Sequence, residues 1–487
     1  MILVIDVGTS SMRSVIFDDN GMSLVTIKRA YDIEVIDKEK IEQDSDIVID
    51  SVLSTLPEIG KWLKETNNKL DAISVTAQRA SVIPVNKNCI PLRKAIMWQD
   101  TRANYVSERL KDKWQDLYQV SGLKPSPIFP IPKIIYLKEE ESFIYDKAYK
   151  ILGFHERVLY ALTNRFVTDT SIASRWGLFD ITKKEWSDEL FDLCDIDINK
   201  FCDVVPVGSI VAETTEEICS LLDIEKSVPV ITAGGDQQCA TLGLGCVDNA
   251  DVVSNCGTGA YVISISDKPI FDKDMRINCN ISAMPDKWII EGTVLGSGKV
   301  IDWTMREFFG GDIDEFQQAC DNTPVGSNNV LFSPTFMGSG TPDWNAAAKG
   351  SIYNISLSNT KSDFARATLE GIAYEVNGCV NIISELMDAD VESVNISGGL
   401  TNNRVYNQIL CDMFDKPVVR VDDAESTALG AFVSAKVTLN QNLDYASVIK
   451  QYLREMNRKI YLPIKENHNL YKEFSNKRIQ QSKIYNY

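Results

Sequence analysis

The sequence predicts an α/β fold composed of two related halves. Apolar stretches typical of buried strands alternate with segments of helical spacing along most of the 487 residues. In addition, a strand that ends in a Gly-Thr turn and leads into a second strand occurs at residues 2–17 and again at residues 252–265. These copies indicate two related domains that face each other. Two unrelated hairpins are the alternative, because Gly-Thr turns are common.

Strands are predicted where short apolar runs end at turn residues. The first strand is residues 2–7, the second runs from Ser14, and Asp-Asn-Gly chemistry at residues 18–21 indicates the hairpin turn that follows. Residues 70–76 and 228–233 have the composition of further buried strands. Apolar spacing predicts helices over residues 104–118, 363–388 and 402–414.

The domain boundary is expected just before the second hairpin. We place the two domains at residues 1–246 and 247–487. The polar tail from about residue 441 is expected to be either a helix packed on the body or a partly loose segment.

The composition excludes several classes of partner. Lys and Arg number 50 and Asp and Glu 68, which gives a formal net charge of −18. Such a chain repels a phosphate backbone and contains no basic run, so we expect neither nucleic acid nor an anionic membrane as a partner. A small nucleotide stays open, because backbone N–H groups and a metal ion can hold its phosphates. No apolar run approaches the ~20 residues that cross a bilayer.

Histidine and cysteine content narrows the chemistry further. His155 and His468 are the only histidines, which argues against a histidine-rich metal site and a Ser-His-Asp hydrolase. The 11 cysteines form no C-x-x-C pair and stand beside apolar residues. We expect reduced core thiols in a cytoplasmic protein, and the first residues lack the basic start of a signal peptide.

The first candidate site is the turn at residues 6–13, which is rich in glycine and hydroxyl groups. Its backbone N–H groups can hold a phosphate, because glycine permits close approach. Asp6 is suited to hydrated Mg²⁺, which uses few protein carboxylates, and Arg13 to a phosphoryl oxygen. The alternative is a polar hairpin turn with a capping aspartate.

The second candidate is Asp236, which follows a buried strand and two glycines and begins a small-residue helix. The carboxyl ends of strands in α/β sheets open into clefts. A carboxylate there can accept a hydroxyl proton during phosphoryl transfer. The alternative is that Asp236 only caps the helix, since aspartate is a favoured N-cap residue.

Other glycine turns and one polar cluster are weaker signals. The turns at residues 257–259 and 296–298 match neither the P-loop nor the dinucleotide fingerprint, and each is equally an ordinary turn. Gly398 and Gly399 stand between a strand and a helix and leave room for a planar ring. A polyol would suit the hydrogen-bonding groups and aromatic wall of Gln78, Arg79, Trp98 and Asp100. A surface Arg–Asp pair beside a half-buried tryptophan is the alternative.

The order of these motifs resembles the FGGY family of carbohydrate kinases over about residues 1–440. The segment at residues 168–186, with its Thr-Asp, Ala-Ser, Leu-Phe-Asp and Trp signals, and the segment at residues 338–344 are similar to that family too. The resemblance implies two ribonuclease H-like (actin-type ATPase) domains with an active-site cleft between them. It also implies phosphorylation of a sugar or polyol hydroxyl by ATP with Mg²⁺, and a homodimer at the level of the family.

Carried over by position, the resemblance implies a role for each candidate residue. Asp236 is the general base, and Asp6 and Asp236 lie at the metal. The ATP-binding residues are Thr9, Ser10, Arg13, Gly257, Thr258, Gly259, Gly298, Gly398, Gly399 and Asn402. The substrate-binding residues are Gln78, Arg79, Trp98, Asp236 and Tyr261.

Departures from the family pattern bear on the substrate. The glycerol kinase branch has a glutamate where this chain has Ala80 and a substrate-binding tyrosine where it has Ile128. Both changes remove polar contacts that a triol needs, which disfavours glycerol. The xylulokinase branch reads Gln-Met-His-Gly where residues 78–81 read Gln-Arg-Ala-Ser, although residues 340–344 and 399–402 resemble that branch more.

The expected function is therefore an ATP-dependent kinase of a ketose such as a pentulose. One alternative is a kinase of glycerol or another polyol. A second is a catalytically silent actin-like protein that binds nucleotide, because the motif residues can persist in a chain without activity.

Overall fold

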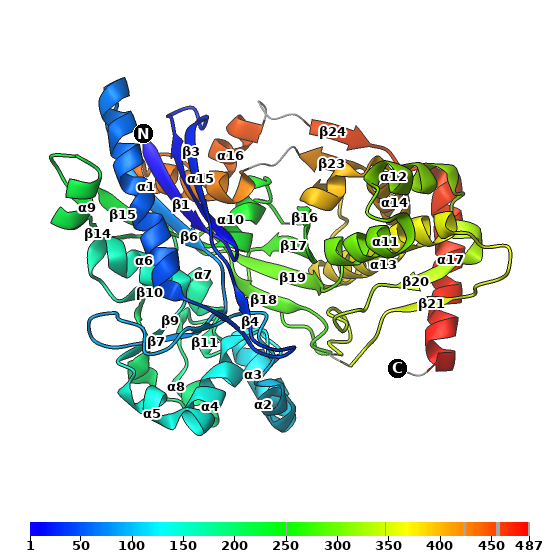
Figure 1. Cartoon of the computed structure of the whole chain (residues 1–487), viewed down its shortest axis with the longest axis horizontal. Coiled ribbons are helices and arrows are strands. Elements are labelled where there is room, and N and C mark those ends of the chain that lie inside the picture. The colour runs from blue at the N-terminus through cyan, green and yellow to red at the C-terminus, as the bar shows by residue number, and fades with distance from the viewer. Residues whose placement is uncertain (250, 346, 422–424, 454–457, 486–487) are drawn as a thin grey trace.

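The computed structural model describes residues 1–249, 251–345, 347–421, 425–453 and 458–485 and contains two large mixed β-sheets, which lie side by side (Figure 1). The first sheet has the order β14-β15-β6-β1-β2-β3. Its strands are β1 (Ile2–Val7), β2 (Ser11–Phe17), β3 (Ser23–Ala30), β6 (Ala72–Ala77), β14 (Ile210–Glu213) and β15 (Pro229–Gly235). The second sheet has the order β18-β19-β17-β16-β22-β23-β24. Its strands are β16 (Val252–Cys256), β17 (Ala260–Ser266), β18 (Asn278–Ile281), β19 (Trp288–Val294), β22 (Val394–Ser397), β23 (Val418–Val421) and β24 (Arg458–Tyr461).

The two sheets follow the same plan. In the first, β1 pairs antiparallel with β2 and parallel with β6, which pairs parallel with β15. In the second, β16 pairs antiparallel with β17 and parallel with β22, which pairs parallel with β23. The repeated hairpin of the sequence is therefore a repeated structural unit. In each sheet the parallel strands end at one common edge, where ligands bind in open α/β sheets.

Helices cover both faces of the first sheet. On one face, α1 (Ser45–Thr66) and α6 (Phe154–Thr163) pack against the strands. On the other face lie α10 (Asp236–Gly243) and α15 (Ser426–Leu439). Since α15 belongs to the second half of the chain, one apolar core joins residues of both predicted domains. The division at residues 246 and 247 stays a prediction.

Glycines allow α10 and α15 to cross with their backbones in contact. A Cβ atom on Gly430 would lie 1.9 Å from the carbonyl oxygen of Cys239, and one on Gly243 would lie 2.0 Å from that of Ser426. No side chain fits at either distance. The crossing therefore requires glycine in each half of the chain.

The second sheet is covered by α11 (Gly298–Phe309), α13 (Lys361–Met387) and α14 (Arg404–Phe414). The predicted helix over residues 363–388 is confirmed, and the one over 402–414 begins two residues late, after a short 3₁₀ turn. The tail is a helix packed on the body: in α17 (Lys465–Tyr485) Tyr471 is buried and donates to Glu370.

The predicted helix over residues 104–118 is wrong as a single element. It consists of α2 (Asn104–Arg109) and α3 (Trp114–Ser121), separated by a 3₁₀ turn. The break lets Tyr118 face a distant strand connection, where its hydroxyl donates to the carbonyl of Ile277. A tertiary contact thus overrides the continuous apolar pattern.

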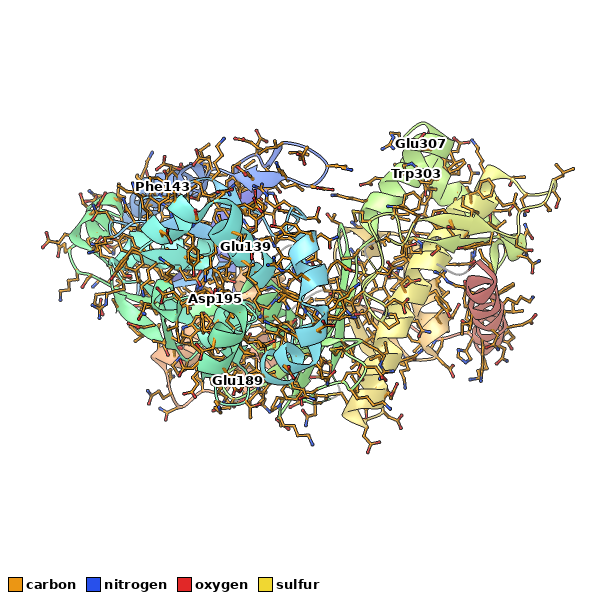
Figure 2. The ribbon with its side chains drawn as sticks, turned by 90° about the horizontal axis from the view of Figure 1, so that it is seen from below. Glu139, Phe143, Glu189, Asp195, Trp303 and Glu307 are labelled. Carbon is orange, nitrogen blue, oxygen red and sulfur yellow. The ribbon has the colours of Figure 1, made fainter. Side chains whose placement is uncertain are left out.

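Two lobes are visible when the molecule is seen from below (Figure 2). Glu139 of α4 (Pro130–Glu140) lies on the lobe of the first sheet, whereas Trp303 and Glu307 of α11 lie on the other. All 11 cysteines are free and ten are buried, as expected of core thiols. Within the described ranges, no helix has the length and apolarity needed to cross a membrane.

Candidate active site

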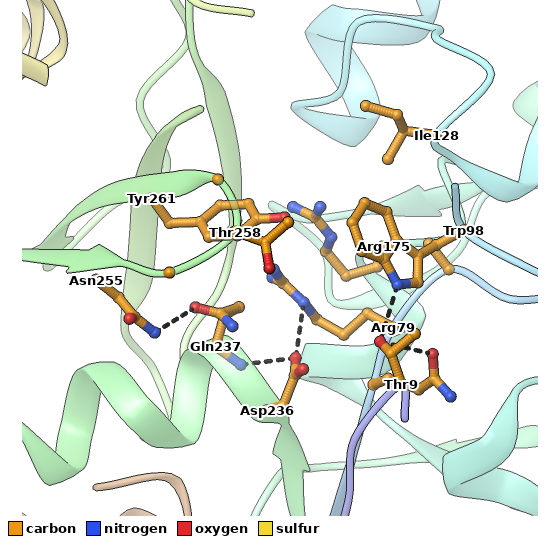
Figure 3. Close-up of a pocket in the computed structure, with 14 residues that line it drawn as sticks. Thr9, Arg79, Trp98, Ile128, Arg175, Asp236, Gln237, Asn255, Thr258 and Tyr261 are labelled. Carbon is orange, nitrogen blue, oxygen red and sulfur yellow. Dashed lines mark hydrogen bonds and ion pairs between the residues drawn. The ribbon is translucent and has the colours of Figure 1, made fainter. Parts of the chain in front are cut away.

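A cavity of about 220 Å³ lies where residues from both sheets meet (Figure 3). It is lined by Thr9, Gln78, Arg79, Ala80, Trp98, Ile128, Arg175, Asp236, Gln237, Asn255, Gly257, Thr258, Gly259 and Tyr261. Most of these residues follow the carboxyl ends of β1, β6 and β15 or belong to the β16–β17 hairpin. The structure therefore brings together nine of the residues singled out from the sequence for catalysis, ATP or substrate.

Asp236 is the first residue of α10 and faces the cavity (Figure 3). Its Oδ1 accepts a hydrogen bond from the backbone N–H of Gln237 at 2.8 Å and lies 3.4 Å from Nε of Arg79. The N-cap residue of the helix is Gly235, so Asp236 does not have the capping role considered from the sequence. Burial raises the pKa of Asp236 to about 6, although Arg79 opposes the rise. The carboxylate is thus ionised at neutral pH and can accept a proton.

Two arginines from the first half share one carboxylate from the second. Nη1 of Arg79 lies 3.1 Å from Oε2 of Glu291, and Nη1 of Arg175 lies 2.9 Å from Oε1 of the same residue, which belongs to β19. All three side chains are almost fully buried. Burial opposes the ionisation of Glu291, but the two guanidinium groups hold its pKa below the usual range. This network joins the two lobes directly beside Asp236.

Arg175 is incompletely bonded within this network. Its Nη1 also donates to Asn280 at 3.1 Å, whereas its buried Nε has no hydrogen-bond partner in the structure. Burial, together with the nearby Arg79, lowers the pKa of Arg175 to about 10. The group is still charged at neutral pH, and its unpaired Nε is enclosed by the protein.

The first turn is tied to the side chains expected to bind the sugar. Oγ1 of Thr9 donates to Oε1 of Gln78 at 3.3 Å and accepts from Nε1 of Trp98 at 3.1 Å. Trp98 therefore has a fixed orientation in the cavity wall. Asp100, in contrast, does not reach the cavity. It is fully buried, pairs with Arg102 and accepts a hydrogen bond from the backbone N–H of Ile41, so its predicted place in a polyol site is wrong.

Asp6 lies behind the cavity rather than in its lining. Nε of Arg13 donates to its Oδ2 at 2.7 Å, as the cross-strand register of β1 and β2 dictates. Burial raises the pKa of Asp6 against the effect of Arg13, and the charge of Asp6 also raises the pKa of Asp236. Two neighbouring carboxylates suit Mg²⁺, which binds one or two of them and keeps its waters. No denser group of metal-binding side chains occurs among the described residues.

The second turn, at residues 257–259 between β16 and β17, is open and glycine-rich. A Cβ atom on Gly257 would have a single neighbour within 4 Å, the carbonyl oxygen of Gly259 at 3.9 Å. The backbone N–H of Gly298 donates to the carbonyl of Gly257 at 2.9 Å, which brings the start of α11 to this turn. The space above the turn is a cradle that a side chain would fill, and it fits a phosphate group.

The remaining predicted residues lie outside the cavity lining. Gly398 has φ +91°, and a Cβ atom on it would lie close to Cys256 and Asn255, which places it against the second turn. A Cβ atom on Gly399 would have no neighbour within 4 Å, and Asn402 accepts from Arg420. Ser10 is exposed. For these residues the role in ATP binding stays a prediction.

Sequence reasoning missed Arg175, Gln237 and Asn255 in the cavity and Glu291 beside it. Glu291 was detectable in principle, because it interrupts the apolar strand β19. Arg175 follows a recognised motif directly but has no signal of its own. Ala80 and Ile128, at which the chain departs from the glycerol kinase pattern, both line the cavity.

Comparison with known proteins agrees with this geometry. The sequence model described as "FGGY family of carbohydrate kinases, N-terminal domain" matches residues 1–243, and the model of the C-terminal domain matches residues 252–439. The chain belongs to the FGGY family of carbohydrate kinases. It is thus a phosphotransferase with an alcohol group as acceptor, which uses ATP and Mg²⁺ and has two ribonuclease H-like domains.

Relatives of this kinase differ in the substrate that their names state. A gluconokinase of Bacillus subtilis is 28% identical over 88% of this chain and 86% of its own length. A xylulose kinase of Staphylococcus epidermidis is 25% identical over 97% of this chain and 95% of its own length. The crystal structure of a ligand-bound xylulose kinase from Lactobacillus acidophilus has a TM-score of 0.92 and 24% identity, and covers 99% of this chain and 98% of that one.

Proposed function

We propose that this kinase transfers the γ-phosphoryl group of ATP to a hydroxyl of an open-chain sugar, with Asp236 as the general base. The supporting observation is that the Asp236 carboxylate shares one cavity with Thr9 of the first turn and with the glycine turn at residues 257–259. A hydroxyl placed there has a base on one side and phosphate-binding turns on the other.

The chemistry is an in-line displacement. Asp236 orients the acceptor hydroxyl and takes its proton as the oxygen forms a bond to the γ-phosphorus, while the bond from that phosphorus to the β-phosphate oxygen breaks and ADP leaves. Asp6 and Asp236 would hold Mg²⁺, which would supply positive charge against the phosphates. Closure of the two lobes excludes water, which would otherwise compete with the acceptor.

We assign the nucleotide to the two turns and the neighbouring glycines. Thr9, Ser10, Arg13 and the turn at residues 257–259 with Gly298 bind the phosphates. Gly398, Gly399 and Asn402 bind the adenosine. The open space at Gly257 and Gly399 supports this assignment, because a ligand can contact the protein backbone only where no side chain occupies the space.

For the acceptor, a ketose such as a pentulose is the first candidate. Gln78, Arg79, Trp98 and Tyr261 supply hydrogen bonds and an aromatic wall. Ala80 and Ile128 line the cavity where the glycerol kinase branch has a glutamate and a tyrosine. Compared with those residues, they leave more space and offer no polar contact, which disfavours glycerol.

A sugar acid is the second candidate, because Arg79 and Arg175 both line the cavity and carry positive charge. A carboxylate in the cavity would be attracted to these guanidinium groups. The name of the Bacillus subtilis relative, gluconokinase, is consistent with such a substrate. The matched pair D-gluconate and D-glucitol, which differ only in a carboxylate or an alcohol at one end, separates the two candidates.

A coupled assay of ADP release over pentuloses, hexuloses, polyols and aldonates tests the proposal. We expect one class to stimulate turnover strongly, and Asp236→Asn to lower kcat about a thousandfold with ATP affinity unchanged. The exposed Asp19→Asn is the matched control. Near-normal kcat in Asp236→Asn would refute the base assignment. Slow ATP hydrolysis that no sugar alters would instead support an actin-like nucleotide switch.

Two further proposals concern the whole chain. We place the kinase in the cytoplasm because of its many free core thiols. A homodimer is proposed on the family resemblance alone, and sedimentation of the purified chain measures it.

A further inference from the structure

Lys133 is a fully buried lysine outside the cavity lining. It stands in the first turn of α4, and its Nζ donates to the backbone carbonyls of Pro127 at 2.5 Å, Ile128 at 2.8 Å and Phe129 at 3.4 Å. It forms no ion pair with any described residue. One amine thus holds three consecutive carbonyl groups of the loop that precedes the helix.

The position of these carbonyl groups explains why the amine is useful. Phe129 is the N-cap residue of α4, so the carbonyls of Pro127 and Ile128 precede the helix and take no part in its hydrogen-bond ladder. Pro130 and Pro132, in the first turn, have no N–H to offer. The side chain of Lys133 supplies a donor, since a buried carbonyl without a partner is unfavourable.

The loop held by Lys133 contributes one residue to the cavity wall and supports another. Ile128 lines the cavity and lies across it from Asp236 (Figure 3). The ring centroid of Phe129 lies 4.9 Å from the guanidinium carbon of Arg175, which lines the cavity as well. A shift of the loop would therefore move an apolar wall and the support of a charged group together.

The surroundings of the amine make its burial unfavourable. Burial lowers the pKa of Lys133 to about 7; Asp100 opposes this and Arg102 adds to it. Asp100 is itself bonded to Arg102, so it does not act as a direct partner of the lysine. A methionine of similar length would pack there without desolvation of an amine, but it would take this donor from the three carbonyl groups.

We propose that Lys133 is a positioning residue for sugar specificity: its three hydrogen bonds fix Ile128 and Phe129 and thereby the wall that selects the acceptor. This inference depends on the proposed function of the cavity. It assigns no chemical step to Lys133, which touches neither the cavity nor the base.

Steady-state kinetics of Lys133→Met with the best acceptor test the inference. We expect the sugar KM to rise about tenfold and the preference among acceptors to weaken, with kcat and the ATP KM within about twofold. Lys133→Arg, which keeps donors at this position, should recover part of the sugar KM. Lys138→Met on the same helix is the matched control and should leave all constants unchanged; its amine bonds outside the loop, to Asp195.

A double-mutant cycle with Ile128→Ala separates positioning from general stability. If Lys133 acts through Ile128, the sugar KM of the double variant equals that of the more impaired single variant. Additive effects, or equal losses in kcat and both KM values, would overturn the inference. Should Lys133→Met fail to fold, the same cycle with Lys133→Arg decides it. Failure of the proposed function is seen separately, as a wild-type chain that phosphorylates no acceptor, and the inference falls with it.

Discussion

The two hairpins of this kinase share a backbone and differ in charge. Asp6-Val7-Gly8-Thr9 in the first corresponds to Asn255-Cys256-Gly257-Thr258 in the second, so a carboxylate stands where the other copy has an amide. Across the ladder, Asp6 faces Arg13, whereas Asn255 faces Tyr261. A second carboxylate would repel phosphates and Asp236. Under the proposed function, this difference gives one copy of the duplicated unit to the metal and leaves the other neutral toward the phosphates.

The largest expected effect comes from Asp6→Asn, which makes the first hairpin like the second. Loss of the carboxylate that we propose to bind Mg²⁺ should lower kcat/KM about a thousandfold and raise the Mg²⁺ concentration needed for half-maximal rate. Titration of activity with Mg²⁺ measures both. Unchanged Mg²⁺ dependence would contradict the role of Asp6, and Asp19→Asn on the exposed turn is the control.

Glu291→Gln removes the carboxylate by which the second half of the chain pairs with Arg79 and Arg175 of the first half. The two guanidinium groups then lack their shared partner, and we expect a loss of about 3 kcal/mol in the free energy of unfolding. Because Glu291 raises the pKa of Asp236, the acid limb of kcat/KM should also move to lower pH.

The control for that variant is Glu375→Gln, which breaks a partly buried ion pair with Arg478, away from the cavity. It should lower stability and leave the pH profile in place. In the wild type, kcat/KM should fall about tenfold per pH unit below about pH 6 as Asp236 takes up a proton. A pH profile unaffected by Glu291→Gln would show that the network does not act on the base.

Gly430→Ala tests the helix crossing to which both halves contribute. The added methyl group meets the backbone of Cys239, which cannot move away as a flexible side chain would, so we expect about 2 kcal/mol of destabilisation. Gly399→Ala is the matched control, since nothing lies within 4 Å of its Cβ position. Chemical denaturation compares the two, and equal stability of both variants would contradict the close crossing.

The smallest expected effect comes from Asn255→Asp, which gives the second hairpin the charge of the first. The new carboxylate lies in the cavity and should raise the ATP KM about tenfold and move the acid limb of kcat/KM to higher pH. Asn255→Ala removes the amide without adding charge and should change the ATP KM less. If the two variants behave alike, charge is not what distinguishes the hairpins.

Local patterns predicted a large part of the fold and the site. The strand–turn–strand repeat, the helix over residues 363–388 and the placement of Asp236 at a strand end all depend on short-range backbone preferences. The continuous helix over residues 104–118 failed because Tyr118 bonds to Ile277, a contact that no local pattern contains. The prediction that Asp100 belongs to a polyol site failed for a similar reason, since Asp100 is bonded to Arg102 and Ile41 instead.

By itself the sequence determined that the chain has two matching α/β halves, with an aspartate at residue 236 after a buried strand. Tertiary structure alone decided that Arg79, Arg175 and Glu291 form one interlobe network and that Lys133 supports the wall of the cavity. The physical reason is range: backbone dihedral preferences act between neighbours, whereas buried charges must find partners wherever the folded chain brings them.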